Sequence, residues 1–539
     1  MSNNACSSSS SSRQFDYCGE DDLRNFLLKF EREEEEELKI SKAMDFSGGG
    51  CFHEMYSNML SAATDAAPPS LLQNQNQELF HPPSSSLVGL SNKYKIKHAV
   101  SGANRASSSL VMSTKEVIEI AAGQFVQVSD PRDEQLLMLD HPLSSMLPRL
   151  PPDAVKSIDL VLLLLFSADK TDQQQLELAV ALLEQCRDQS SNVGNPVERL
   201  VHYFSEALQE RIERKMQFGS WKQLPIAKAG SLSEDTTEEE VMLSQHPGLL
   251  ALRDILPFTE VLQFTAIQAI AERVATATRV HLIDLGIMAG MRWTILMQVF
   301  ATRSRHPIKL LKISAVGPSK DKVDEIGKHL KDFAKKLNLR FAFNAVIVSD
   351  RKDLEEQSFG LKAGEVVAIH APFILRMMIL RPASLEKVMR LLRGLKPCVM
   401  IVSEIQASLN STSFIKRFTE ALFFYGAWFD CVGICLEEYD LWRMAVESQL
   451  FRRGIRSMIA AEDSDRLIRH VQIDVWRSFF ARFGFVEIDL GRPALYQAQL
   501  INDQFACASC CTNAMDGKGL TIGWKGTPLH FVSAWRLQR

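Results

Sequence analysis

The segment 284–290, DLGIMAG, contains the residues of this chain whose types and spacing best suit cofactor chemistry. Asp284, Gly286 and Gly290 follow the apolar stretch 280–283, which predicts a short buried strand. Folds that bind dinucleotides or S-adenosylmethionine place glycines at this position, because the ligand approaches the backbone closely beside the start of a helix. The glycine pattern is sparser than a methyltransferase turn usually has, and Ile287 adds a bulky side chain.

A cofactor of this kind also needs an acidic residue near the end of the second strand, where a carboxylate holds the ribose hydroxyls. The second strand pattern, 310–313, continues through the segment 314–319, and no acid occurs before Asp321. We therefore expect no bound cofactor and interpret Asp284, Gly286 and Gly290 as a degenerate turn that the fold retains. A small-molecule methyltransferase is the alternative.

Other catalytic and metal-binding patterns are weaker. The sequence has no GxSxG elbow, no P-loop and no HExxH helix. The stretch 507–511, CASCC, resembles metal-ligand spacing, but a zinc site needs a second ligand pair and only His530 is near in sequence. Loop thiols are the favoured interpretation, and no metal is expected. His281, on a buried strand, is interpreted as a satisfied core residue rather than a catalyst.

Charge and targeting signals narrow the class of protein. A net charge of -4 argues against a generally basic nucleic-acid binder. Arg452, Arg453 and Arg456 are basic but lack the interleaved aromatic residues of a single-strand binder, so we expect DNA to be contacted indirectly, with direct DNA binding as an alternative. The N-terminus lacks the apolar core of a secretory signal, and the longest apolar run, 160–166, is too short to cross a membrane. The cysteines are interpreted as free thiols in the cytosol or nucleus.

The elements that would position these residues form an α/β pattern from residue 276 to 539. Apolar stretches typical of strands alternate with helical patterns, which predicts a parallel sheet with helices on both faces. Two final stretches, 485–488 and 529–535, predict a closing antiparallel pair. This order is typical of a Rossmann-like, class I methyltransferase-type sheet. The five predicted parallel strands are 280–283, 310–313, 341–348, 366–369 and 399–402.

Residues 153–275 predict an α-helical cap subdomain, because apolar residues recur there at helical spacing. Asn195 and Pro196 supply a helix cap followed by proline at the first helical position. Residues 111–152 are predicted to be a linker.

Residues 1–110 form a low-complexity tail that we expect to be largely disordered, because it cannot bury enough apolar surface to offset its chain entropy. A possible short helix lies within 21–40. Its docking into a partner's groove is one interpretation; a solvated helix or packing on the main domain is the other. The apolar stripe of this helix consists of Leu23, Phe26, Leu27 and Phe30.

Several longer segments resemble the signature motifs of the plant GRAS family. VHLID at 280–284 is similar to the VHIID motif, and GWKGTPLHFVSAWR at 523–536 is similar to the SAW segment. Residues 195–215 resemble the end of the first leucine-rich region, and 414–430 resemble the PFYRE region. The motif residues expected to matter for interaction are Val280, His281, Leu282, Ile283, Asp284, Trp293, Phe424, Tyr425, Arg453, Trp524, Ser533, Ala534 and Trp535.

The resemblance implies a nuclear transcriptional regulator, with a helical cap over a Rossmann-like core, that acts in development or in hormone or symbiosis signalling. The implied partners are other GRAS proteins, in homodimers or heterodimers, and DNA-binding transcription factors. Where the family commonly has an Arg-Glu pair, this chain has Arg453 and Gly454, so any salt bridge made by that glutamate is missing. The tail contains no DELLA sequence, which argues against gibberellin-receptor control of the DELLA type.

Overall fold

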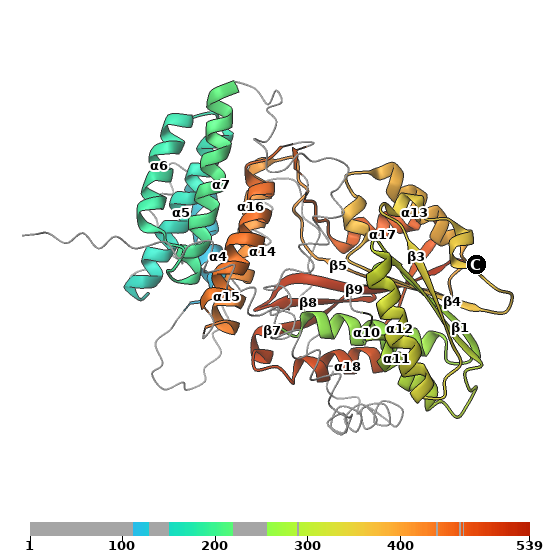
Figure 1. Cartoon of the computed structure of the whole chain (residues 1–539). Helices are drawn as coiled ribbons and strands as arrows, with labels where there is room; N and C mark the ends of the chain where they lie inside the picture. Colours follow the sequence, from blue (N-terminus) through green and yellow to red (C-terminus); the bar gives the residue numbers. More distant parts are fainter. Residues whose placement is uncertain are drawn as a thin grey trace, which may run out of the picture. The chain divides into compact units, whose positions relative to one another are not determined.

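The computed structural model describes residues 112–128, 150–218 and 256–538, apart from short gaps at 288–289, 291, 438–439, 463–464 and 467. These residues form an α/β core and a helical cap (Figure 1). The predicted tail, including the apolar stripe of Leu23, Phe26, Leu27 and Phe30, lies outside the described residues.

The core is built on a nine-stranded sheet with the order β3-β2-β1-β4-β5-β9-β8-β7, in which β6 also pairs with β9. The first five strands are parallel. Because β1 pairs with β2 on one side and β4 on the other, the strand order reverses at the end of β1, where open α/β sheets bind ligands. All five predicted parallel strands are confirmed: β1 (Arg279–Asp284), β2 (Leu310–Gly317), β3 (Phe341–Ile347), β4 (Val366–Pro372) and β5 (Val399–Ile405).

The antiparallel end of the sheet is organised around β9 (Thr527–Leu537). One edge of β9 pairs with β5, while its other edge pairs first with β8 (Gly519–Trp524) and then with β6 (Phe485–Ile488). This confirms the predicted closing pair. The structure adds a hairpin of β7 (Cys511–Asp516) and β8, which turns at Gly517 with φ of +60°. The dipeptide Asp516-Gly517 is a typical hairpin signal that the sequence interpretation did not use.

Helices cover both faces of the sheet, as predicted (Figure 1). Buried side chains of α13 (Pro382–Gly394) and α17 (Ile473–Ala481) share one apolar core with β4, β5 and β9. On the other side, α10 (Phe258–Arg273) packs against β5, β9, α11 (Trp293–Ala301) and α18 (Arg492–Asn502). The helix α12 (Lys320–Lys336) packs against β2, β3 and α11.

The cap combines two segments of the chain. The first supplies α4 (Thr114–Val128), α5 (Pro152–Asp172), α6 (Leu176–Gln189) and α7 (Pro196–Phe218). The second supplies α14 (Phe414–Cys435) and α16 (Arg452–Ile459), which are joined by α15 (Asp440–Ala445) and a π-helical turn at Val446–Phe451. The helix α14 packs against α4, α5 and α7, and α16 packs against α7.

These contacts correct the predicted boundaries of the cap. The predicted linker 111–152 contains α4, an amphipathic helix whose apolar stripe includes the buried Val117, Ile118 and Phe125. The cap was predicted to end at residue 275, but α10 belongs to the core, and residues 414–459 join the cap instead. Periodicity identifies an apolar face but not its partner, so the sequence did not reveal this exchange.

The helix α14 is the one helix in the described part of the chain whose length and apolar composition would suffice to cross a membrane. Its most apolar window is 78% buried inside the protein. The neighbouring helices of the cap and strands of the core account for this burial. A helix that is apolar on all sides is expected at the centre of a large protein, and α14 occupies such a position.

Candidate functional site

Asp284, at the carboxyl end of β1, is 3% exposed and has both carboxylate oxygens engaged. Its Oδ2 accepts a hydrogen bond from Nε1 of Trp293 at 2.8 Å, and its Oδ1 accepts one from the N–H of Gly286 at 3.2 Å. Nδ1 of His370, the paired residue on β4, lies 3.5 Å from Oδ1. The His370 ring packs edge-on against Trp293. The aspartate therefore fixes the turn to the start of α11.

A small cavity of about 60 Å³ lies beside Asp284. Helix α10 forms one wall, and the ends of β1 and β4 form the other. Pockets for drug-sized ligands usually have volumes of about 300–1,000 Å³, so this cavity has room for water but not for a nucleoside. Its lining includes Thr259, Gln263, Asp284, Gly286, Trp293 and His370.

The glycines of the predicted cofactor turn are in contact with protein side chains. A Cβ atom added to Gly286 would lie 2.5 Å from Cδ1 of Ile374, and one added to Gly290 would overlap Ile326. Gly290 has φ of +68°, a conformation that favours glycine. Ile374 and Ile326 thus occupy space that a cofactor would need for a close approach to this backbone.

The end of β2 also lacks the acidic residue that would hold the ribose hydroxyls of a nucleotide cofactor. This strand ends at Gly317, and a Cβ atom there would lie 2.6 Å from Val323 of α12. The nearest acid, Asp321, is exposed on α12 rather than placed at the strand end. The residues present at this position do not fit S-adenosylmethionine.

His281 is a satisfied core residue, as predicted. Its side chain is 0% exposed, with Nδ1 3.1 Å from Oε2 of Glu365 and Nε2 2.8 Å from Oγ of Ser314. Burial, together with the nearby charge of Lys312, lowers the pKa of His281 to about 4. With both ring nitrogens partnered, this histidine is not positioned to transfer protons to a ligand.

The residues of the SAW resemblance are buried in β9. Trp535 is 1% exposed, donates a hydrogen bond from Nε1 to Oγ of Ser533 at 2.8 Å, and packs edge-on against Phe480 at a centroid distance of 4.8 Å. Ala534 lies between Ile401 of β5 and Ile488 of β6. The remaining VHIID residues Val280, Leu282 and Ile283 are equally buried in β1. Their role in partner binding stays a prediction, and any such role would act through the fold they support.

Asp430 of α14 connects the cap to the β8–β9 hairpin. Its Oδ2 accepts a hydrogen bond from Nε1 of Trp524 at 2.7 Å and pairs with Nζ of Lys525 at 2.8 Å. Its Oδ1 accepts weaker hydrogen bonds from the backbone and hydroxyl of Thr114, on α4. Three segments distant in sequence therefore meet at one buried carboxylate, which the sequence interpretation did not single out.

The residues of the PFYRE resemblance lie inside the cap. Phe424 and Tyr425 of α14 are buried and pack edge-on against each other at 5.2 Å. Arg453 is half-buried on α16. A Cβ atom on Gly454 would overlap the hydroxyl of Tyr425, so a larger side chain at position 454 would not fit this packing.

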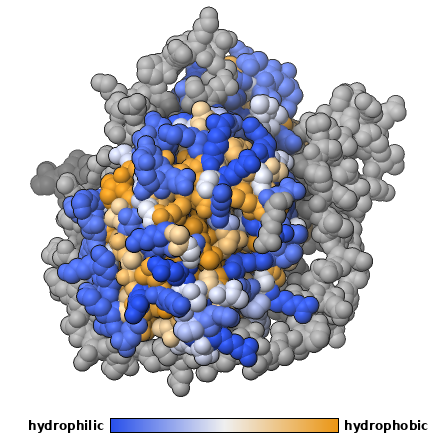
Figure 2. Space-filling view, turned by 90° about the vertical axis from the view of Figure 1, so that its right-hand side faces the viewer, coloured by the Kyte–Doolittle hydropathy of each residue, from blue (hydrophilic) through white to orange (hydrophobic). Residues whose placement is uncertain are grey.

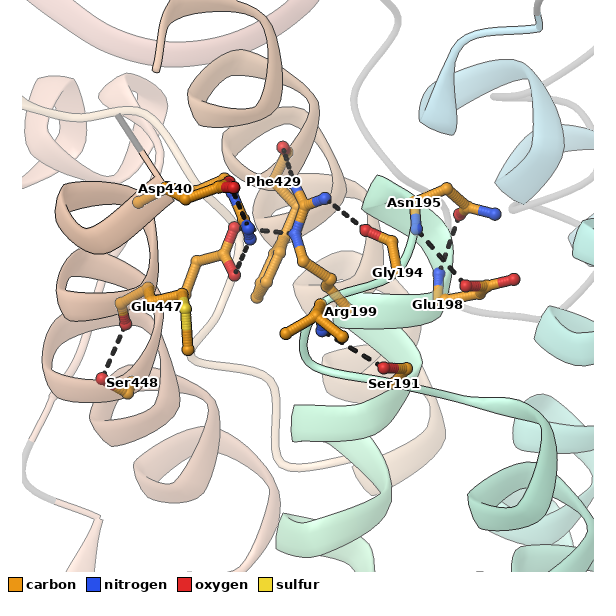
Figure 3. A network of polar contacts seen from close by, with 12 residues as sticks. Ser191, Gly194, Asn195, Glu198, Arg199, Phe429, Asp440, Glu447 and Ser448 are labelled. Carbon is orange, nitrogen blue, oxygen red and sulfur yellow. Dashed lines mark hydrogen bonds and ion pairs between the residues drawn. The ribbon is translucent and has the colours of Figure 1, made fainter. Parts of the chain in front are cut away.

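A buried ionic network connects α7 to the second segment of the cap (Figure 3). Nε of Arg199 donates to Oε1 of Glu447 at 2.9 Å, and Nη2 of Arg199 donates to the carbonyl of Phe429 at 3.3 Å. Nη1 of Arg443 lies 3.3 Å from the second oxygen of Glu447. Burial raises the pKa of Glu447, while the charges of Arg199 and Arg443 oppose this effect.

A second network lies at the other end of the same interface. Glu462 forms ion pairs with Arg211 of α7 at 2.5 Å and with Arg417 of α14 at 2.7 Å. Arg417 is 0% exposed and also donates to the carbonyl of Met458 at 2.9 Å. Sequence reasoning missed both networks, because the partners on α7 and in the second segment are about 250 residues apart in sequence.

The strand order defines a Rossmann-like, methyltransferase-type domain with a helical cap, in which protein side chains fill the end of β1 where the strand order reverses. The family model of the GRAS domain family matches residues 160–536, and the chain belongs to this family of plant regulators. DELLA protein RGL1 of Arabidopsis thaliana is 30% identical over 387 residues, which cover 71% of this chain and 70% of that protein. Protein SCARECROW of Ipomoea nil is 33% identical over 382 residues, 71% of this chain and 47% of its own length.

Structural comparison agrees with the family assignment. The crystal structure of SCL7 from Oryza sativa has a TM-score of 0.58 and 27% sequence identity, and the match covers 66% of this chain and 94% of that structure. The resemblance noted in the motifs is therefore confirmed, as are the Rossmann-like fold and the assignment to transcription regulation in plants.

Proposed function

We propose that this GRAS-family chain is a nuclear transcriptional regulator that works through protein contacts and does not catalyse methyl transfer. The expected partners are other GRAS proteins and DNA-binding transcription factors. The observation that carries the proposal is the packing at the end of β1, where Ile374 and Ile326 fill the approach to Gly286 and Gly290.

The hydrogen-bond partners of Asp284 also argue against a cofactor site. In a cofactor site, the polar groups at this strand end would be free to face the ligand, which binds outside the carboxyl ends of the strands. Here the oxygens of Asp284 are used by Trp293 and the Gly286 backbone, and the adjoining cavity of about 60 Å³ is too small for a nucleoside. The site is thus built as a packed turn that supports the outer surfaces of the core.

The surface favours protein partners over nucleic acid. On the face seen from the right-hand side of Figure 1, apolar residues gather toward the middle and polar residues surround them (Figure 2). Apolar surface with a polar rim is typical of protein interaction sites. The arginine cluster of α16 is partly neutralised, because Arg452 pairs with Glu206 at 2.8 Å and Arg456 pairs with Glu210 at 2.5 Å.

Isothermal titration of the full chain with S-adenosylmethionine tests the absence of catalysis. We expect no measurable heat of binding. Micromolar binding that is abolished by Asp284→Ala, with the melting temperature of the variant reported alongside, would overturn this half of the proposal.

Affinity purification from plant nuclei, read by mass spectrometry, tests the partner half. We expect a DNA-binding transcription factor or a second GRAS protein to be recovered with the tagged chain. Recovery of neither, together with salt-sensitive gel shifts by the purified chain alone, would instead favour direct DNA binding.

A further inference from the structure

The strand β3 forms one edge of the sheet, and its outer side has no partner strand within the described residues. Its sequence, FAFNAVI, contains no charged residue and no proline. Native edge strands usually carry such residues, because an apolar edge pairs readily with another chain. The strand at the opposite edge, β7, does include a charge, at Asp516. Of the two edges, β3 is therefore the one that is open to the addition of a strand.

The peptide groups of β3 point alternately toward β2 and toward the open edge. The N–H of Leu311 donates to the carbonyl of Arg340 at 2.9 Å, and the N–H of Val348 donates to the carbonyl of Gly317 at 3.2 Å. The even-numbered residues between Arg340 and Val348 face β2 as well, because peptide groups alternate along a strand. The outward N–H and C=O groups belong to the remaining residues of the strand, which are Phe341, Phe343, Ala345 and Ile347.

The side chains of these four residues lie on the face of the sheet that α12 covers. The Phe343 ring lies against Gly327 of α12, where an added Cβ atom would be 2.4 Å from it. Asn344 points to the other face, and its Nδ2 donates to Oγ of Ser314 at 3.0 Å and to the carbonyl of Ser358 at 2.9 Å. Ile347, at the end of the strand, is 39% exposed. Outward peptide groups and apolar side chains thus belong to the same residues.

The strand is complementary to itself. In an antiparallel pair with its twofold axis at Asn344, Phe341 opposes Ile347 of a second copy, and Phe343 opposes Ala345 of that copy. All outward peptide groups then face one another, and each such pair of residues exchanges two hydrogen bonds. Aromatic residues opposite β-branched ones are among the favourable cross-strand pairs, and the small Ala345 leaves room for the Phe343 ring.

The charges of α12 favour the same arrangement. This helix packs on β3 and runs antiparallel to it, with the N–H of Leu339 donating to the carbonyl of Ala334 where helix turns into strand. Residues 320–326 carry two lysines and three acids, a net charge of −1, whereas residues 328–336 carry four lysines and one aspartate, a net charge of +3. A twofold axis normal to the sheet keeps both helices on one face, antiparallel to each other. The acidic half of each helix then lies beside the basic half of the other.

We propose that a second copy of this chain pairs with β3 edge to edge, so that the two sheets join through an antiparallel β3–β3 contact. Such an interface is isologous, because both copies use the same surface. One strand and one helix give an interface near the low end of the roughly 1,200–2,000 Å² that stable complexes bury. We therefore expect a dimer that dissociates on dilution. This contact would supply a surface for the GRAS partner that the proposed function expects, and it rests on that function only for its biological role.

Sedimentation velocity of the purified full chain over a range of concentrations measures the association. Ile347→Lys places a charge opposite Phe341 of the copy, and Ala345→Pro removes an outward N–H without touching the bonds to β2. Each should raise the dissociation constant of the dimer by about tenfold or more. The control Met515→Lys changes a residue of β7 that is 47% exposed, and it should leave the association unchanged.

Oxidative cross-linking tests the register. Asn344→Cys puts a thiol on the twofold axis, where the Cα atoms of opposed residues are about 4.5 Å apart, a separation that a disulfide can span. The control Ala342→Cys opposes Val346 of the copy, so its two thiols are too far apart to bond. Trypsin releases the peptide 341–351, which has no native cysteine. We expect this peptide in doubled, reducible form from Asn344→Cys alone.

Three results would each overturn the proposal. They are a chain that stays monomeric at every concentration, a dimer that neither Ile347→Lys nor Ala345→Pro weakens, and a cross-link that forms through Ala342→Cys instead. Melting temperatures of the variants show that each is folded, and Ile347→Lys changes an exposed side chain. Because all of these measurements use the purified chain, their failure is distinct from a failure to recover transcription factors from nuclei.

Discussion

Gly454→Ala tests whether the packing of Tyr425 against α16 excludes any side chain at position 454. A Cβ atom there would overlap the Tyr425 hydroxyl and lie 3.0 Å from its Cζ. The ring of Tyr425 is 5% exposed and packs against Phe424 at 5.2 Å and Phe451 at 6.2 Å, so it has no open space into which to retreat.

The expected magnitude follows from two opposing terms. Overpacking a buried site costs about 1–3 kcal/mol. Replacing glycine by alanine in a helix gains about 1 kcal/mol. The net expectation is a loss of about 0–2 kcal/mol, which in a protein of this size lowers the melting temperature by up to roughly 4 °C.

Differential scanning fluorimetry of purified variants measures this shift. Gly394→Ala is the matched control, because Gly394 is also helical but its added Cβ would have an ordinary contact of 3.6 Å with Glu356. The control should be neutral or slightly stabilised, and Tyr425→Phe should recover part of the loss in Gly454→Ala. If Gly454→Ala melts at or above the temperature of the control, the steric argument is wrong.

Three further substitutions probe buried charges. Glu447→Ala leaves Arg199 buried without its carboxylate and should cost about 3–5 kcal/mol in urea denaturation; a loss below about 1 kcal/mol would contradict the assignment. Asp430→Ala removes the partner of the Trp524 indole and should cost about 2–3 kcal/mol and shift the tryptophan emission; unchanged emission would argue against the contact. Burial raises the pKa of Glu404 to about 7, above its unfolded value of 4.5, so its contribution to stability is largest below pH 4.5 and is lost as the pH rises to about 7. Glu404→Gln should flatten this decline, which amounts to about 3 kcal/mol, and equal slopes in both proteins between about pH 5 and 8 would refute the inference.

The sequence predicts those features of the fold that depend on local pattern. The five parallel strands are continuous apolar runs, and such runs are typical of strands buried on both faces. The missing acid at the end of β2 also leads to the prediction that Asp284 is not part of a nucleotide site, and this stays a prediction. The side chains that fill the site, Ile374 and Ile326, come from other elements, and nothing local to the glycines identifies them.

Pairing between distant segments is the part that the sequence does not reveal. Asp430 and Trp524 are 94 residues apart, and Arg199 and Glu447 are 248 residues apart. Each of the charged residues Asp430, Arg199 and Glu447 would, on its own, be compatible with an exposed helix surface. Their burial depends on α14 and α16 joining the cap, which an apolar pattern on each helix allows but does not specify.

The two-segment construction of the cap leads to a last prediction, that the core does not form a stable unit without the first segment. A fragment of residues 256–539 would retain α14 but lose α4, α5 and α7, which cover it. Phe418 packs against Phe204 at 5.4 Å, and Phe429 packs against Tyr203 at 5.8 Å, so these aromatic side chains would become exposed. Aromatic side chains bury about 150–250 Å² each, which at about 25 cal/mol per Å² is roughly 4–6 kcal/mol for each one exposed.

Size-exclusion chromatography with scanning calorimetry measures the outcome. The fragment 256–539 should elute as aggregate without a cooperative transition, because the exposed face of α14 has no remaining partner. The fragment 112–539, which retains both segments of the cap, is the control and should elute as a defined species that unfolds cooperatively. A monodisperse fragment 256–539 with its own sharp transition would show that α14 is stabilised mainly by the sheet, and that the cap is an independent domain after all.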